Sequence, residues 1–117
     1  MVKVPDEISL MSLFECDPKM LDEKIPFFYN ESTYRFSNKN NEEFLVVIRP
    51  SYGDIKVQVT MEDTNEIISI MEFGNVESIE ILCDKRDESK IMITSEHSVI
   101  KINFKPNFKF FINQFYS

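Results

Sequence analysis

The sequence predicts a mainly β fold: an antiparallel meander of about seven strands forming a sandwich or a curled sheet, with a short N-terminal helix. Apolar runs of strand length recur roughly every 8–12 residues from about Phe44 to Phe104, and compact turn signals separate them. Long helical patterns do not alternate with these runs, which argues against a parallel α/β fold. A length of 117 residues suits one domain, so we expect a single β-rich domain over residues 1–117.

The N-terminal part of the chain leaves its secondary structure open. Residues 7–15 fit either a short helix or a first strand, because their periodicity does not decide between the two. Asp17 and Pro18 predict the start of a brief helix over residues 19–24, with Asp17 as the N-cap. The aromatic cluster at 27–29 is expected to cover one open face or end of the sheet.

The expected strands share alternating or nearly continuous apolar side chains and are bounded by polar turns. In chain order they cover residues 32–36, 43–49, 55–61, 66–73 and 76–84, a run around Ile91 and Ile93, and residues 100–104.

Two of these strands and the C-terminal tail carry specific expectations. The strand at 55–61 alternates strictly between apolar and polar residues, so one face should be core and the other solvent or partner. The strand at 43–49 is nearly continuously apolar, which indicates burial on both faces. The tail at 107–117 is rich in phenylalanine and predicts a last strand or an amphipathic helical turn. It is too apolar to dangle in water, so we expect it to pack somewhere.

The charge of the chain limits its partners. Twenty acidic and 13 basic residues give a formal net charge of −7. Such a surface repels phosphates and anionic headgroups, so we expect neither a nucleic acid nor a membrane as partner. It favours a cationic protein and speeds the encounter with it. The alternative is that the charge only keeps the protein soluble.

The sequence offers little for catalysis or cofactor binding. His97 is the only histidine, and a zinc site needs several histidine or cysteine ligands. Two glycines cannot build a phosphate-binding loop. Cys16 and Cys83 are expected to be buried or half-buried thiols, although a disulfide between them stays open. We therefore expect no enzyme activity, no metal and no cofactor.

The N-terminus has no signal-peptide pattern, and no run approaches the ~18–20 apolar residues of a membrane span, so a cytoplasmic protein is expected.

Candidate partner-binding residues are an exposed-looking turn tyrosine and a series of carboxylates at strand ends and in loops. Tyrosine is favoured at the anchors of interfaces, and loop carboxylates could dock a basic protein; ordinary solvated turns are the alternative. The candidates are Tyr52, Glu62, Asp63, Glu66, Glu77, Glu80, Asp84, Asp87 and Glu88. Glu72 also falls at an expected strand end.

The stretch from Phe44 to Phe104, with EIISIMEFGNVESIEI at its middle and VIKINFKPNF at its end, carries a family resemblance. It resembles the small acidic immunity proteins of bacterial polymorphic-toxin and contact-dependent growth inhibition systems. The resemblance implies a non-catalytic inhibitor that binds a cognate toxin domain, often a nuclease, and covers its active site. The family has no shared catalytic motif, so no functional residue is carried over. A nuclease is cationic around its site, which suits an acidic inhibitor, and we expect this inhibitor to be a monomer.

Two other functions stay open. A small acidic chaperone or adaptor for a secreted or phage protein would use the tail at 108–115 as a groove or dimer surface. A small enzyme or lipid binder would need a pocket inside the curled sheet.

Overall fold

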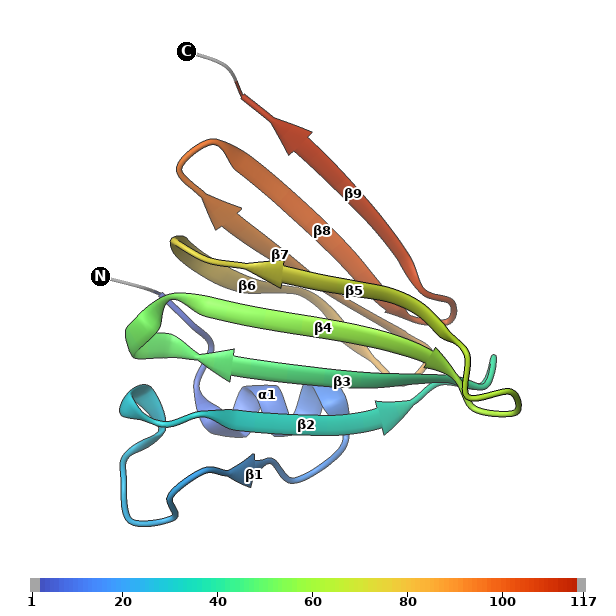
Figure 1. The fold of residues 1–117 in the computed structure, drawn as a ribbon, viewed down its shortest axis with the longest axis horizontal. Helices are drawn as coiled ribbons and strands as arrows, with labels where there is room; N and C mark the ends of the chain where they lie inside the picture. Colours follow the sequence, from blue (N-terminus) through green and yellow to red (C-terminus); the bar gives the residue numbers. More distant parts are fainter. Residues whose placement is uncertain (1–2, 116–117) are drawn as a thin grey trace.

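The computed structural model describes residues 3–115, and within them nine strands form two antiparallel sheets (Figure 1). The first sheet has the order β1 (Lys19–Met20), β2 (Ser32–Ser37), β3 (Glu42–Arg49), β4 (Asp54–Met61) and β5 (Ile67–Phe73). The second has the order β6 (Val76–Lys85), β7 (Glu88–Ser95), β8 (Ser98–Lys105) and β9 (Lys109–Gln114). The mainly β meander predicted from the sequence is confirmed.

The two sheets and one helix, α1 (Glu7–Phe14), enclose a single core. Figure 1 shows α1 behind β2 and β3, where it continues the layer formed by the second sheet. Leu10, Leu13 and Phe14 are its buried residues, and their spacing places them on one helical face. The helix therefore fills the part of the first sheet that β6–β9 leave uncovered.

An aromatic cluster joins these layers. The ring of Phe14 from α1 lies 4.8 Å from Tyr34 of β2 and 5.5 Å from Phe104 of β8, measured between centroids. The ring of Phe44 from β3 meets Phe104 edge to face at 5.2 Å. Such tilted arrangements suit the quadrupoles of aromatic rings. Both sheets and the helix thus share the same packed interior.

The burial of side chains on β3 and β4 agrees with the prediction on the inner face of the sheet and differs from it on the outer face. Val57 and Val59 of β4 are fully buried, as expected. In β3, Val46 is buried, whereas Leu45 and Val47 are only half-buried. The expected burial of this strand on both faces is wrong, because its outer face carries no second layer in the described part of the chain.

The N-terminal helix lies earlier in the chain than the helix start that Asp17 and Pro18 predict. Residues 7–15 were left open between helix and strand, and α1 takes this stretch with Asp6 as its N-cap. The carboxylate of Asp6 accepts a 2.7 Å hydrogen bond from the Ser9 backbone N–H, which lowers the pKa of Asp6. The helix predicted at residues 19–24 is wrong. Lys19 and Met20 instead form β1, which pairs with β2. A helix confined between Pro18 and Pro26 would form too few hydrogen bonds to offset the free-energy cost of helix nucleation.

Two further elements differ from expectation. The cluster at 27–29 forms the 3₁₀ turn η1 (Phe27–Tyr29), in which Phe27 packs against the core but Tyr29 is 66% exposed. The C-terminal tail forms a strand, one of its two predicted outcomes, but all six residues of β9 are exposed. Within this single chain β9 does not pack away from water, and it extends past β5 in Figure 1, so the packing of the tail stays a prediction.

No helix within residues 3–115 is both long enough and apolar enough to cross a membrane.

Candidate protein-binding surfaces

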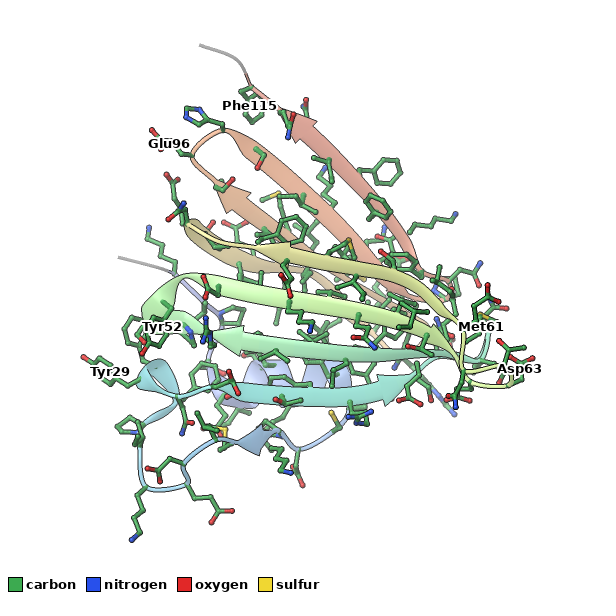
Figure 2. The ribbon with its side chains drawn as sticks, viewed as in Figure 1. Tyr29, Tyr52, Met61, Asp63, Glu96 and Phe115 are labelled. Atoms are coloured by element: carbon green, nitrogen blue, oxygen red, sulfur yellow. The ribbon has the colours of Figure 1, made fainter. Side chains whose placement is uncertain are left out.

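Three turns meet at one end of the molecule, which we call the hairpin end: the β2–β3 loop (38–41), the β4–β5 loop (62–66) and the β6–β7 turn (86–87). The Glu62 backbone N–H donates to the Asn41 carbonyl at 2.9 Å. The Lys39 ammonium lies 3.4 Å from the Asp87 carboxylate. Figure 2 labels Met61 and Asp63 at this end. Loops from both sheets therefore form one continuous surface here.

A buried polar network supports the hairpin end. The Asn38 side-chain amide donates to the Glu42 carboxylate at 2.9 Å and to the Phe104 carbonyl at 2.8 Å. The same carboxylate oxygen accepts the Phe108 backbone N–H at 3.0 Å. Asn38 and Glu42 lie in the β2–β3 hairpin of the first sheet, and Phe104 and Phe108 lie in the β8–β9 hairpin of the second. The network thus fixes the β2–β3 loop against the β8–β9 turn.

Most of the predicted carboxylates lie at or near the hairpin end. Glu62, Asp63 and Glu66 are exposed on the β4–β5 loop, and Asp87 is exposed on the β6–β7 turn. Carboxylates from both sheets therefore share one surface, as the docking hypothesis requires.

Two other predicted carboxylates near the β6–β7 turn already have partners. Asp84 accepts a 2.8 Å hydrogen bond from the Ser12 hydroxyl of α1. Glu88 is half-buried, and a hydrogen bond from Cys83, with the neighbouring Lys90 cation, lowers its pKa. These two carboxylates are less available to a partner than those of the loops.

The remaining predicted residues lie elsewhere. Tyr52 lies in the 3₁₀ turn η2 (Pro50–Tyr52), at the opposite end of the first sheet from Asp63 (Figure 2). Glu77 is near the same end, because the Val76 N–H beside it donates to the Gly53 carbonyl at 3.0 Å. Glu80 is exposed on β6 between the two ends. The nine predicted residues therefore do not form a single site.

Tyr52 keeps the exposure expected of an interface anchor. Its ring is 71% exposed, and the Arg49 guanidinium lies 4.9 Å from the ring centroid. Arg49 also forms a salt bridge with Asp54. Tyr29 lies at the same end, as Figure 2 shows. Tyr29 does not stand out in the sequence as a surface residue, because a dense aromatic run signals core at least as strongly as surface.

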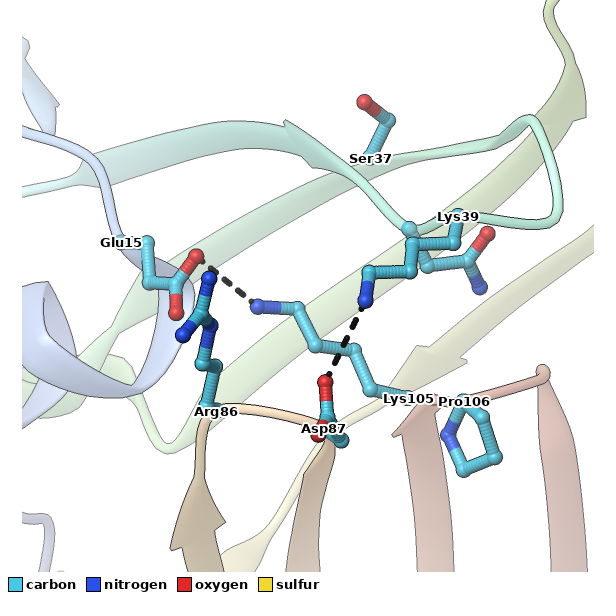
Figure 3. Close-up of a pocket in the computed structure, with 8 residues that line it drawn as sticks. Glu15, Ser37, Lys39, Arg86, Asp87, Lys105 and Pro106 are labelled. Atoms are coloured by element: carbon cyan, nitrogen blue, oxygen red, sulfur yellow. Dashed lines mark hydrogen bonds and ion pairs between the residues drawn. The ribbon is translucent and has the colours of Figure 1, made fainter.

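A shallow pocket of about 380 Å³ opens beside the hairpin end (Figure 3). Lys105 reaches it from β8 and forms a 3.0 Å ion pair with Glu15 at the end of α1. Arg86, Lys39 and Asp87 also line it. The pocket carries both signs of charge, so it suits a charged side chain of a partner. Sequence reasoning missed it because its residues come from four distant segments.

Potential metal ligands are not grouped in the described part of the chain. Within residues 3–115, no three His, Cys, Asp or Glu side chains converge to hold a metal ion. His97 is paired with its neighbour Glu96 at 3.7 Å on the surface. Cys16 and Cys83 are free, half-buried thiols, as predicted, and partial burial raises the pKa of each.

Comparison with known proteins gives a likeness of fold. No family model matches the chain, and no curated protein matches it. The structure is similar to a chain of a solved structure described as a contact-dependent growth inhibition toxin–immunity protein complex from Klebsiella pneumoniae 342. The TM-score is 0.69, the sequence identity is 22%, and the match covers 95% of each chain. At this identity, the likeness shows a shared fold.

Proposed function

We propose that this protein is a non-catalytic inhibitor of the immunity type, which binds a cognate toxin domain and blocks its active site. The observation that carries the proposal is the fold likeness to a chain of a toxin–immunity protein complex over 95% of both chains. The sequence resemblance to immunity proteins supports it independently. The protein would act in the cytoplasm, in a one-to-one complex with its toxin.

The charge of the chain supports a cationic partner of the nuclease type. A nuclease needs lysine and arginine around its active site to hold phosphates. A protein of net charge −7 would be attracted to that surface, and long-range attraction speeds association.

We assign the toxin-binding surface to the hairpin end. Exposed carboxylates from two loops meet there: Glu62, Asp63 and Glu66 on the β4–β5 loop, and Asp87 on the β6–β7 turn. The buried hydrogen-bond network of Asn38 supports these loops from below. The mixed-charge pocket beside Lys105 would take a charged side chain of the toxin. Tyr52, Glu77 and Glu80 would then lie outside the contact, or mark its far margin if the toxin is large.

Binding to the product of the adjacent upstream gene tests the function. We expect a stable complex in a pull-down and loss of toxin activity on complex formation. A purified toxin that neither binds this protein nor loses activity in its presence contradicts the proposal.

Charge reversal tests the surface. The double variant Glu62→Lys/Asp63→Lys should slow association at least tenfold at low salt and reduce its dependence on ionic strength. The matched control Glu77→Lys/Glu80→Lys changes the net charge equally at a different place. Equal slowing by both variants would mean that only total charge matters, and slowing by the control alone would move the site.

A second candidate function, an acidic chaperone or adaptor, is favoured by the exposed phenylalanines of β9. A chaperone would suppress aggregation of unfolded clients through this strand, and an inhibitor would leave them unaffected.

A further inference from the structure

The last strand, β9, forms an open edge of the second sheet. In the sheet order, β9 pairs with β8 on one side and ends the sheet on the other. An open edge presents a row of backbone N–H and C=O groups to any strand of matching shape. Such edges are usually short, bulged or charged. The register of β9 with β8 runs from Lys109 to Gln114 without a bulge.

Both faces of this edge carry exposed apolar side chains. Phe110 and Ile112 pair with Ile102 and Ile100, so they share the core-facing side of the sheet, yet they are 45% and 48% exposed. Phe111 points to the other side and is 64% exposed. A strand docked here would remove apolar surface from water on both faces at once.

The outward backbone groups belong to the even-numbered residues. The Phe115 N–H donates to the His97 carbonyl at 2.7 Å, across the ladder that joins β8 and β9. Backbone groups alternate in direction along a strand, so Phe111 turns its groups toward β8. Phe110 and Ile112 turn theirs outward, where a new strand would bind.

The β9 edge also lies in a segment of the chain that has no acidic residue. Residues 98–115 contain three lysines, Lys101, Lys105 and Lys109, and no aspartate or glutamate. The rest of the molecule therefore carries all of the net negative charge. Two copies that meet at this edge keep their acidic surfaces apart.

We propose that two copies of this chain pair through β9, antiparallel and edge to edge, about a two-fold axis at Phe111. In this register the Phe111 side chains meet each other on one face, and Phe110 meets Ile112 of the other copy on the opposite face. Lys109 lies opposite Asn113, so no like charges face each other. Phe110 and Ile112 exchange both backbone hydrogen bonds, and each sheet continues into its copy.

Strand β5, the long edge of the first sheet, fits a second copy less well. Strand β5 exposes Ile67, Ile68 and Ile70, but a register shift at its pairing with Val59 and Thr60 distorts it. Carboxylates also flank it, at Glu66 and Glu72. Self-pairing there would bring two acidic edges together. The edge strand β6 already exchanges backbone hydrogen bonds with Lys3, at Glu77 and Ile79.

Sedimentation of the full chain tests the pairing. We expect the mass to rise with concentration from that of the 13.8 kDa chain to twice that value. Phe111→Lys places two ammonium groups against each other on the axis and should give a monomer at every concentration. Ile70→Lys makes the same kind of change on β5 and should leave the dimer intact. A wild-type chain that is monomeric throughout, or a dimer lost only in Ile70→Lys, overturns the proposal.

Cysteine cross-linking tests the register, in a background with Cys16→Ser and Cys83→Ser. Phe111→Cys should form a disulfide-linked dimer, because directly opposed residues of antiparallel strands lie about 4.5–5.5 Å apart at Cα. Asn113→Cys lies on the same face, but its two copies would be roughly 14 Å apart along the strands, and it should not cross-link. Cross-linking of the second variant alone overturns the register.

The pairing does not depend on the proposed inhibitor function, and a third measurement separates the two. Phe111→Lys should bind the toxin as tightly as the wild-type chain does. If it loses toxin binding while the wild-type chain sediments as a monomer, the edge belongs to the toxin and the pairing is wrong.

Discussion

Inside the core, the Tyr34 hydroxyl has no hydrogen-bond partner among the described residues, although the side chain is fully buried. Burial disfavours the phenolate and raises the pKa of Tyr34, and the Glu7 carboxylate adds to the shift. The group therefore remains neutral at any ordinary pH. It contributes its ring to the contact with Phe14, but its oxygen has lost water without a replacement.

Tyr34→Phe should therefore raise the free energy of unfolding by about 1 kcal/mol, because it keeps the ring and removes an unsatisfied oxygen. Urea unfolding followed by far-UV circular dichroism measures the change. Tyr29→Phe is the control, since that hydroxyl lies at the surface and its loss should change little. A loss of 1 kcal/mol or more in Tyr34→Phe would mean that the hydroxyl is bonded, for instance to an ordered water.

At the scale of elements, the sequence predicts the strands well and the ends of the chain poorly. Strict alternation located β4 to within one residue, because a buried face imposes a period of two. The signal at Asp17 and Pro18 failed, since local capping chemistry was weaker than pairing of Lys19 and Met20 with β2. What β9 packs against could not be predicted from the sequence. The apolar sequence of a strand indicates that it needs a packing partner, but not whether that partner belongs to the same molecule.

The loop network makes a second prediction, at the junction of the sheets. Asn38→Ala removes the amide that bonds both Glu42 and Phe104, and leaves a buried carbonyl and carboxylate short of donors. The free energy of unfolding should fall by about 2 kcal/mol. Asn40→Ala is the matched control, because Asn40 is exposed and its amide reaches Glu42 only at 3.5 Å. Urea titrations measure the free energy of unfolding of both variants. An equal decrease in the two would show that the buried bonds of Asn38 do not stabilise the fold more than the exposed contact of Asn40.

At the scale of the whole molecule, individual carboxylates could be predicted from the sequence as candidate binding residues, but not which of them lie together in the fold. Asp63 and Asp87 lie more than twenty residues apart and meet at the hairpin end through contacts of the β2–β3 loop between them. Tyr52 and Glu77, on equally good local grounds, lie at the other end. Which turns share an end of a sandwich depends on strand number and pairing. The unexpected strand β1 adds to the first sheet, and β9 leaves an open edge on the second.

The shared core makes the last prediction. Phe104 of the second sheet packs against Phe14 of α1 and Phe44 of the first sheet, so neither sheet can keep its interior when the other unfolds. Phe104→Ala should lower the free energy of unfolding by about 3–5 kcal/mol. Two-state unfolding requires that every probe report the same loss.

Tyrosine fluorescence and circular dichroism supply the two probes. The chain has no tryptophan and four tyrosines. Tyr29, Tyr34 and Tyr52 all belong to η1 or to the first sheet and its turns. Tyr116 lies outside the described residues and is replaced by phenylalanine in both proteins, so that the fluorescence reports the first sheet. In Phe104→Ala, we expect the fluorescence and far-UV transitions to move together to lower urea, whereas Phe115→Ala, at an exposed position, should move neither. A fluorescence transition that stays in place while the far-UV signal shifts would show that the sheets unfold as separate units, against the single core described above.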